Sequence, residues 1–524
     1  MKRCPECDAT YADETLNFCL EDGTPLNAVD SIEPATAIMP GGLVDEVTQV
    51  LARSRGVVSG SEHENSIAVL PFVNMSADAE NEYFCDGLAE ELLNALAKID
   101  DLKVAARTAA FSFRGKNVPM SEIGESLKVR TILEGSVRKS GNKLRITIQL
   151  INAADGYHVW SERYDRDMQD IFEIQDEITL AVVDALKLKL LTPEKNAVLK
   201  RHTNDAEAYQ LYLRGRFFFY KRTPEGFRKA IEYFEKAIEL DPDYVVAISG
   251  LADSHVFLGF YEMVSPAEAA SNVRPLAERA IAMDRTLSET NTTYALLLTL
   301  YDWKHRESLD YFQAAVVADP KYAFAYHLES AISAVLGEYE RAVAGEKRAI
   351  ELDPFTPVFN ASLAWWHYIG GRTALAVEQC ERTIDIAPNH FFAYWVLGLA
   401  YSIEERHSEA VVALQQASGL NQFESFVRSD LAMVFAAMGE KESALEIIEE
   451  FERSARETYI SPLNFARVYI GLGDYERALT ELERACDECS VRMPWTLVDP
   501  ISKPLRSDPR FKMLCERVGV GVIE

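Results

Sequence analysis

The chain has 524 residues, 48% of them hydrophobic, and carries 54 basic against 82 acidic residues for a formal net charge of -28. A chain of this length exceeds one compact core, so about three or more structural units are expected. The negative charge repels phosphate backbones and anionic lipid surfaces, so direct binding to nucleic acid or to a membrane surface is not expected.

Targeting and membrane signals are not recognisable in the sequence. The N-terminus lacks the apolar segment of a signal peptide, and no stretch approaches the roughly 20 apolar residues that span a bilayer. The eight cysteines thin out after the N-terminal region and do not suggest a disulfide framework. We therefore expect a cytoplasmic protein without a membrane span.

Residues 1–27 contain a cysteine pattern, CPEC followed by FCLEDG. A Cys-x-x-Cys turn presents two thiolates to one zinc ion, and carboxylate oxygen is an accepted further ligand. So short a segment lacks a sufficient apolar core, and we expect a bound metal ion to stabilise its fold. The pattern predicts a structural zinc site made of Cys4, Cys7, Cys19 and Asp22. Water in place of Asp22 and a metal-free tail are the alternatives.

Two further regions precede the second half of the chain. Residues 28–65 are rich in Pro, Gly, Ser and Glu and are predicted to be a linker. Residues 66–195 alternate short apolar runs with amphipathic segments, which is typical of an α/β domain. The strongest strand signal is KLRITIQL (143–150), where apolar and polar residues alternate. We expect it to be the middle strand of a three-stranded meander that a long helix follows.

Residues 205–522 repeat a helix–turn–helix pattern. Pro320, Pro354 and Pro388 follow one another at intervals of 34 residues, which is the tetratricopeptide period. Small residues between the two helices of a pair allow close approach, and proline ends the second helix. We predict about eight tetratricopeptide repeats, several of them degenerate, that form an all-α superhelical solenoid.

Two family resemblances extend these predictions. The stretches SIAVLPFVNMSADAENEYFCDGLAEELLNALAKI and ILEGSVRKSGNKLRITIQLINAADGYHVWSERYDRDMQDIFEIQDEI resemble the TolB-like amino-terminal domain of bacterial signalling proteins. In that family the domain typically precedes tetratricopeptide repeats and often accompanies a kinase, a nucleotide cyclase or a winged-helix DNA-binding domain. The resemblance implies a second binding or sensing module and carries over no catalytic residues. Residues 1–27 resemble the minimal zinc ribbons of bacterial signalling proteins.

Catalytic motifs are not recognisable. The sequence contains no phosphate-binding loop, no dinucleotide-binding glycine motif after a strand, and neither GxSxG nor HExxH. Cys486 and Cys489 form a second Cys-x-x-Cys but have no matching pair nearby, so buried or incidental cysteines are the favoured interpretation. We expect a protein that is not an enzyme.

The concave side of the repeats is the predicted binding groove. The first helix of each pair lines that side in such arrays. The repeat period brings one group of side chains close to it, namely Phe324, His327, Trp365, Tyr368, Phe392 and Trp395. Aromatic residues on such a face suit an extended peptide or a partner helix, although packing between repeats explains any single one equally well.

These observations predict a non-enzymatic cytoplasmic scaffold or adaptor whose repeats bind a peptide or protein partner. The α/β domain is then a second binding or sensing module. The alternative is a regulatory component of a signalling or transcription system that is associated with a kinase, a cyclase or a DNA-bound complex. The sequence specifies neither the partner nor the oligomeric state.

The zinc site gives the first testable prediction. The full chain is expected to retain about one zinc ion after dialysis, and Asp22→Ala is expected to weaken that retention. Metal content measured by atomic emission on the wild type and the variant checks both statements. A wild-type chain without zinc contradicts the site.

Overall fold

The computed structural model of the chain describes residues 2–3, 10–11, 27–28, 65–78, 81–190, 192–420 and 424–521. The chain divides into two compact units, 1–62 and 63–524. In the first unit, β1 (Lys2–Arg3) pairs antiparallel with both β2 (Thr10–Tyr11) and β3 (Asn27–Ala28). The predicted zinc ligands Cys4, Cys7, Cys19 and Asp22 lie outside the described residues, and so does most of the predicted linker.

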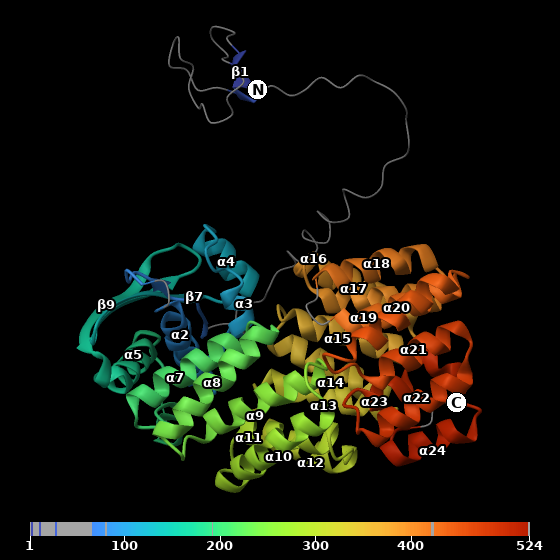
Figure 1. The fold of residues 1–524 in the computed structure, drawn as a ribbon. Helices are drawn as coiled ribbons and strands as arrows, with labels where there is room; N and C mark the ends of the chain where they lie inside the picture. Colours follow the sequence, from blue (N-terminus) through green and yellow to red (C-terminus); the bar gives the residue numbers. More distant parts are fainter. Residues whose placement is uncertain are drawn as a thin grey trace. The chain divides into compact units, whose positions relative to one another are not determined.

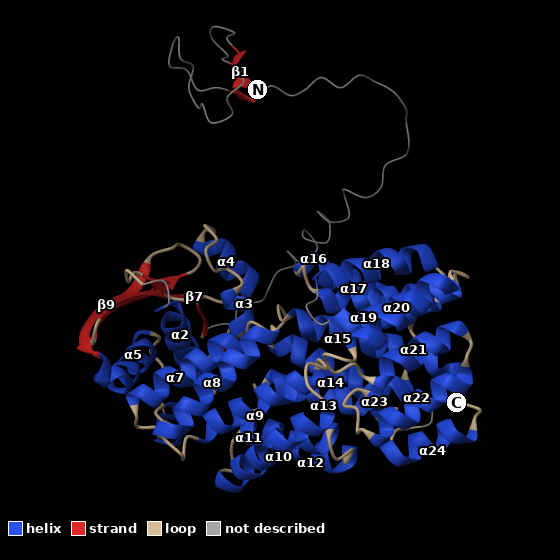
Figure 2. Cartoon of the chain, in the orientation of Figure 1, coloured by secondary structure: helices blue, strands red, loops and turns tan. Residues whose placement is uncertain are grey.

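The second unit begins with an α/β domain around a mixed six-stranded sheet (Figures 1 and 2). Its strands are β4 (Ser66–Val69), β5 (Val73–Asn74), β6 (Lys103–Val104), β7 (Thr131–Ser140), β8 (Lys143–Asn152) and β9 (His158–Asp167). The order is β6-β4-β7-β8-β9, and β5 also pairs with β7. β4 runs parallel to β6 and β7, whereas β7, β8 and β9 form the predicted antiparallel meander.

The alternation along β8 explains how this sheet is covered. Its apolar side chains, Leu144 to Leu150 at every second position, are buried against α2 (Glu82–Ala97) and α5 (Ile171–Ala185). A smaller cluster, which includes Ala68 and Ile132, lies on the opposite face beside α4 (Met120–Leu127). The remaining short elements are α3 (Arg107–Phe111), η2 (Met168–Asp170) and α6 (Thr192–Val198).

Eight antiparallel helix pairs follow in the described part of the chain, coloured from green to orange-red in Figure 1. The first four pairs are α7 (Ala206–Phe219) with α8 (Pro224–Leu240), α9 (Val245–Phe260) with α10 (Pro266–Met283), α11 (Ser288–Leu300) with α12 (His305–Ala318), and α13 (Ala323–Val335) with α14 (Tyr339–Leu352). The next four are α15 (Pro357–Ile369) with α16 (Thr373–Ile386), α17 (Phe391–Ile403) with α18 (His407–Leu420), α19 (Glu424–Ala437) with α20 (Lys441–Ser454), and α21 (Pro462–Leu472) with α22 (Tyr475–Asp487).

Small residues set the spacing of these helices. Phe234 of α8 is fully buried between Gly215 of α7 and Gly250 of α9. A Cβ atom at Gly215 would lie 2.5 Å from the Phe234 ring, and one at Gly250 would lie 2.8 Å from it. Both distances are too short for a real contact, so glycine is required on both sides of this ring.

The last elements depart from the predicted repeat array. The sequence predicts repeats as far as residue 522, but the chain after α22 forms α23 (Met493–Val498), η3 (Pro500–Leu505) and α24 (Pro509–Val518). Pro500 begins η3 shortly after α23 ends, and Pro504 lies inside η3. Because proline lacks the backbone donor and clashes with the preceding turn, an α-helix does not continue through this segment.

These last elements join the final repeats to much earlier ones. The Nε2 atom of His305 lies 3.0 Å from the carbonyl oxygen of Val518, and Asn464 donates a hydrogen bond of 2.9 Å to Glu262. Tyr368 donates a hydrogen bond of 2.7 Å to Asp499. The helix pairs are therefore closed by contacts between residues more than a hundred positions apart in sequence.

A buried ionic cluster fixes the α/β domain to the first repeat. Glu90 of α2 accepts hydrogen bonds from Arg107 of α3 at 2.8 Å and from Arg216 of α7 at 2.6 Å. Lys321, before α13, donates to the carbonyl oxygens of Ala97 at 2.8 Å and Ile99 at 3.1 Å. An ammonium group at the C-terminal end of α2 complements the helix dipole, so the domain is held at two separate points.

The Glu90 cluster gives a stability prediction. Glu90→Gln leaves two partly buried guanidinium groups without their counter-charge, and we expect it to destabilise the folded chain by about 3–5 kcal/mol. Glu82→Gln on the same helix is the control, because Glu82 pairs with Arg114 at the surface, where such a pair contributes about 0–1 kcal/mol. Urea unfolding at pH 7 measures both. Equal effects of the two variants would contradict a special role for Glu90.

Candidate functional site

A cavity of about 1400 Å³ lies between the α/β domain and the repeats of the second unit. Helices α2 and α3 form one wall. The first helices of seven consecutive pairs, from α7 to α19, form the other, with Trp495 of α23. The predicted concave side of the array is thus a cavity in which the α/β domain contributes part of the wall.

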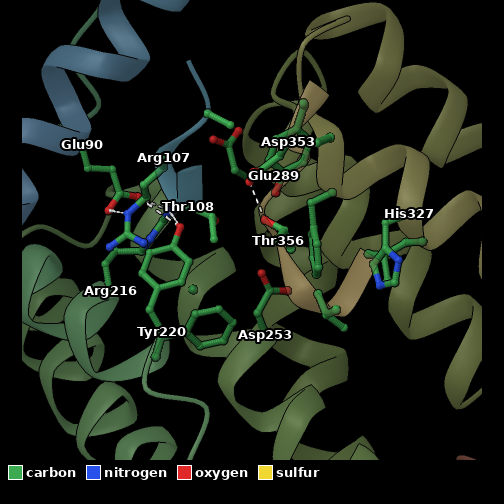
Figure 3. Close-up of a pocket in the computed structure, with 18 of the residues that line it drawn as sticks. Glu90, Arg107, Thr108, Arg216, Tyr220, Asp253, Glu289, His327, Asp353 and Thr356 are labelled. Atoms are coloured by element: carbon green, nitrogen blue, oxygen red, sulfur yellow. Dashed lines mark hydrogen bonds and ion pairs between the residues drawn. The ribbon is translucent and has the colours of Figure 1, made fainter. Parts of the chain in front are cut away.

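Charged side chains gather on two sides of this cavity, as Figure 3 shows. On one side Glu90, Arg107, Arg216 and Tyr220 lie together. The Arg107 guanidinium carbon lies 4.0 Å from the centre of the Tyr220 ring, and the Tyr220 hydroxyl donates a hydrogen bond of 3.1 Å to Glu90. Burial alone would raise the pKa of Glu90, but Arg107 and Arg216 lower it below its usual range. The charge of Glu90 is therefore compensated.

Carboxyl groups on the other side are less well compensated. Figure 3 shows Asp253, Glu289, Asp353 and Thr356 there, and Thr356 donates a hydrogen bond to Asp353. Burial raises the pKa of Asp253 to about 7, and the hydrogen bond of 2.8 Å from Thr293 and the positive charge of Arg216 only partly oppose this shift. On the first side, burial and the neighbouring Glu90 raise the pKa of Glu91 to about 7. Both groups change charge near neutral pH.

Aromatic side chains form the far end of the cavity. Trp365 stacks on Trp366 with ring centres 5.0 Å apart and contacts Trp395 and Phe392, each at 5.5 Å. Trp495 of the C-terminal segment stacks on Trp365 at 6.3 Å. Such a wall offers apolar surface to a ligand and at the same time packs neighbouring repeats together.

Five of the six predicted groove residues line the cavity, namely Phe324, His327, Trp365, Phe392 and Trp395. Phe324 and Phe392 are partly exposed, whereas Trp365 and Trp395 are only 8% and 2% exposed. His327 is buried, with Nδ1 3.0 Å from Glu346. Their role in binding stays a prediction, and partial exposure makes Phe324 and Phe392 the accessible members.

Tyr368, the sixth predicted residue, lies outside the cavity lining. It is fully buried, and its hydroxyl group donates to Asp499. Asp499 also accepts a hydrogen bond of 3.0 Å from Arg467. Tyr368 thus contacts the closing C-terminal segment, which the repeat period alone does not place.

Sequence reasoning missed several cavity residues. Arg222 lies in the turn between α7 and α8, where the repeat register assigns no role. Arg492 and Trp495 follow the last recognisable repeat. Asp253 is one acidic residue among 82 acidic positions and carries no distinguishing pattern. These side chains line the same cavity only because the array of helix pairs is closed.

Neither a metal centre nor a membrane span is found in the described ranges. No group of three or more His, Cys, Asp and Glu residues there is arranged to hold a metal ion. Over the same part of the chain, no helix combines the length and the apolar character needed to cross a membrane.

Comparison with protein families assigns the two main regions. Residues 62–181 match the second domain of HilA/YgeH-like transcriptional regulators. Residues 227–244 and 463–489 match the tetratricopeptide repeat, near the two ends of the array of helix pairs. The predicted tetratricopeptide solenoid is therefore confirmed. The resemblance of residues 66–195 to a TolB-like domain stays a prediction.

Two curated relatives match parts of the chain. A putative adenylate cyclase 3 of Rhizobium meliloti is 36% identical over 243 residues, which are 46% of this chain and 41% of that protein. Anaphase-promoting complex subunit 3 of Schizosaccharomyces pombe is 25% identical over 180 residues, which are 32% of this chain and 26% of that protein. The chain thus spans less than half the length of either relative.

Solved structures also match the repeats. A tetratricopeptide repeat protein from Parabacteroides merdae covers 51% of this chain and 100% of its own, with 14% identity and a TM-score of 0.36. A thermophilic tetratricopeptide repeat protein from Thermus thermophilus covers 39% and 99%, with 19% identity and a TM-score of 0.31. At these TM-scores the matches add nothing to the repeat assignment.

Asp253 gives a pH-dependent prediction. Because its pKa is about 7 in the folded chain and near 4 when unfolded, its contribution to stability falls as the pH rises from about 4 to 7 and stays low above that. Asp253→Asn keeps an acceptor for Thr293 and should stabilise the chain by roughly 1–3 kcal/mol at pH 8, with a smaller effect at pH 5.

Urea unfolding at the two pH values measures this effect. Asp310→Asn is the matched control, because Asp310 is exposed on α12 and should change stability little at either pH. Equal effects of Asp253→Asn at pH 5 and pH 8 would show that the buried charge does not limit stability.

Proposed function

We propose that this protein is a non-enzymatic interaction scaffold whose cavity takes a peptide or a segment of a partner protein. The observation that carries the proposal is the cavity of about 1400 Å³, lined by the first helices of seven consecutive helix pairs. A surface that continues over many repeats matches an elongated ligand better than a small compact one.

The composition of the cavity wall supports the proposal. Aromatic rings supply contact area at low entropic cost, and Phe324 and Phe392 are partly exposed within it. Basic residues outnumber acidic ones in the lining, although the whole chain carries a net charge of -28. The cavity therefore attracts negatively charged groups, which the rest of the surface repels.

A regulatory role is the second candidate function. The match of residues 62–181 to a domain of transcriptional regulators and the similarity to a putative adenylate cyclase support it. In this version the α/β domain is a second binding or sensing module, and the partner is a component of a signalling or transcription system. The predicted zinc module at residues 1–27 would then add a small docking or structural element.

Affinity capture from the native host tests the scaffold proposal. We expect the full chain to retain a defined partner and the variant Phe324→Ala/Phe392→Ala to retain it at least about tenfold less well, because partly exposed aromatics dominate such contacts. The matched control is Val317→Ala/Val412→Ala, which removes two exposed apolar side chains outside the cavity.

The two candidate functions differ in what is captured. A kinase, a cyclase or a DNA-binding protein among the retained partners would favour the regulatory role. Identical retention by wild type, cavity variant and control would exclude the cavity as the binding surface. Melting temperatures of all three proteins establish that the variants remain folded.

A further inference from the structure

Arg222 is a largely buried cation on the cavity wall without a counter-charge in contact. Among the described residues, none forms a hydrogen bond or an ion pair with its guanidinium group. The group lies over two rings, 4.2 Å from the centre of Phe257 and 4.9 Å from that of Phe219. Burial lowers the pKa of Arg222, which reflects the unfavourable desolvation of its charge.

The backbone at this position is also unfavourable. Arg222 has a φ of 51°, in the left-handed region that favours glycine or asparagine after a helix. Glu262, Trp303 and Glu405 adopt the same conformation in the corresponding turns of later helix pairs, so this backbone belongs to the repeat turn. The unpaired charge among the described residues is what distinguishes Arg222.

Arg492 is a second cation of the same kind on the cavity wall. It is 13% exposed, and its nearest carboxylate contact, to Glu262, is 4.0 Å long. Its guanidinium carbon lies 4.0 Å from the centre of the Phe426 ring. Other cavity arginines are satisfied, since Arg107 pairs with Glu90 at 2.8 Å and Arg348 with Glu351 at 2.9 Å.

Arg222 and Arg492 share a neighbourhood although they lie 270 positions apart in the sequence. Burial raises the pKa of Tyr261, and the positive charges of Arg222 and Arg492 both act against that shift. The Phe257 ring in contact with Arg222 has its centre 6.2 Å from that of the Tyr261 ring, and Arg492 contacts Glu262, the next residue along the chain. Both guanidinium groups therefore lie beside the segment around Tyr261, which also lines the cavity.

We propose that Arg222 and Arg492 form a subsite in the cavity that binds a carboxylate of the peptide partner, either an acidic side chain or a C-terminus. Guanidinium groups match the geometry of carboxylates, and a bound carboxylate supplies an ion-pair partner to Arg222 and a closer one than Glu262 to Arg492. Asp253 also acts electrostatically on Arg222, so a singly charged carboxylate meets less repulsion there than a phosphate dianion.

The subsite deepens the proposed function, and a displayed library of random peptides tests it on the full chain. We expect the wild type to enrich peptides that carry Asp, Glu or a free C-terminus at a fixed distance from apolar residues. Arg222→Gln should lose this acidic preference and bind a selected peptide at least about tenfold more weakly. Arg348→Gln, the matched cavity control, should bind it within about twofold of wild type.

Each outcome has a distinct meaning. Enrichment of peptides without an acidic group, or an unchanged acidic preference in Arg222→Gln, overturns the subsite and leaves the scaffold proposal intact. No enrichment of any peptide overturns both. Competition by inorganic phosphate at a much lower concentration than acetate would assign the subsite to phosphate and overturn the carboxylate assignment.

The melting temperature of the ligand-free chain provides a readout that requires no peptide. Because the charge of Arg222 is uncompensated, Arg222→Gln should leave the melting temperature unchanged or raise it. Arg107→Gln removes a compensated arginine and should lower it. A decrease in Arg222→Gln as large as that in Arg107→Gln would show that Arg222 is a structural residue and would overturn the proposal.

Discussion

A buried charge destabilises a protein unless a partner compensates it, and three compensated clusters hold the second unit together. Glu90 lies between Arg107 and Arg216 and attaches the α/β domain to the first repeat. Arg467, only 4% exposed, pairs with both Asp430 and Asp499 and holds the C-terminal segment against the last repeats. Glu346 accepts hydrogen bonds from Ser330 and Trp366 between neighbouring pairs. The first cluster joins elements that are distant in sequence, and the other two join elements that are close in sequence.

The cavity exists because these clusters fix its walls. Not every buried charge in those walls is compensated, since Arg222 has no ion pair with any residue that the structure describes and burial raises the pKa of Asp253 to about 7. The contrast is informative because Glu90, Arg467 and Glu346 all have close partners. Incomplete compensation is therefore concentrated at the surface where a ligand would supply the missing group.

Local patterns predicted the elements, because helix and strand periods are properties of neighbouring residues. The alternation in 143–150 predicted the meander, and the spacing of Pro320, Pro354 and Pro388 predicted the helix pairs. Closure of the array was not predictable, because it depends on single contacts such as that of His305 with Val518. The repeat period indicated which aromatic positions face inward. It did not reveal that Trp495 would stack on Trp365.

The closing contacts have a consequence for synthesis of the chain. A ribosome releases the α/β domain and the first repeats long before Asn464 and Val518, which later bind Glu262 and His305. The α/β domain is able to dock on α7 at once, whereas Phe260 gains its ring partner Trp495, at 6.1 Å, only after residue 495 has been made. Nascent chains therefore expose an aromatic surface until Trp495 has emerged, and premature termination before that residue leaves the surface open to chaperones and to aggregation.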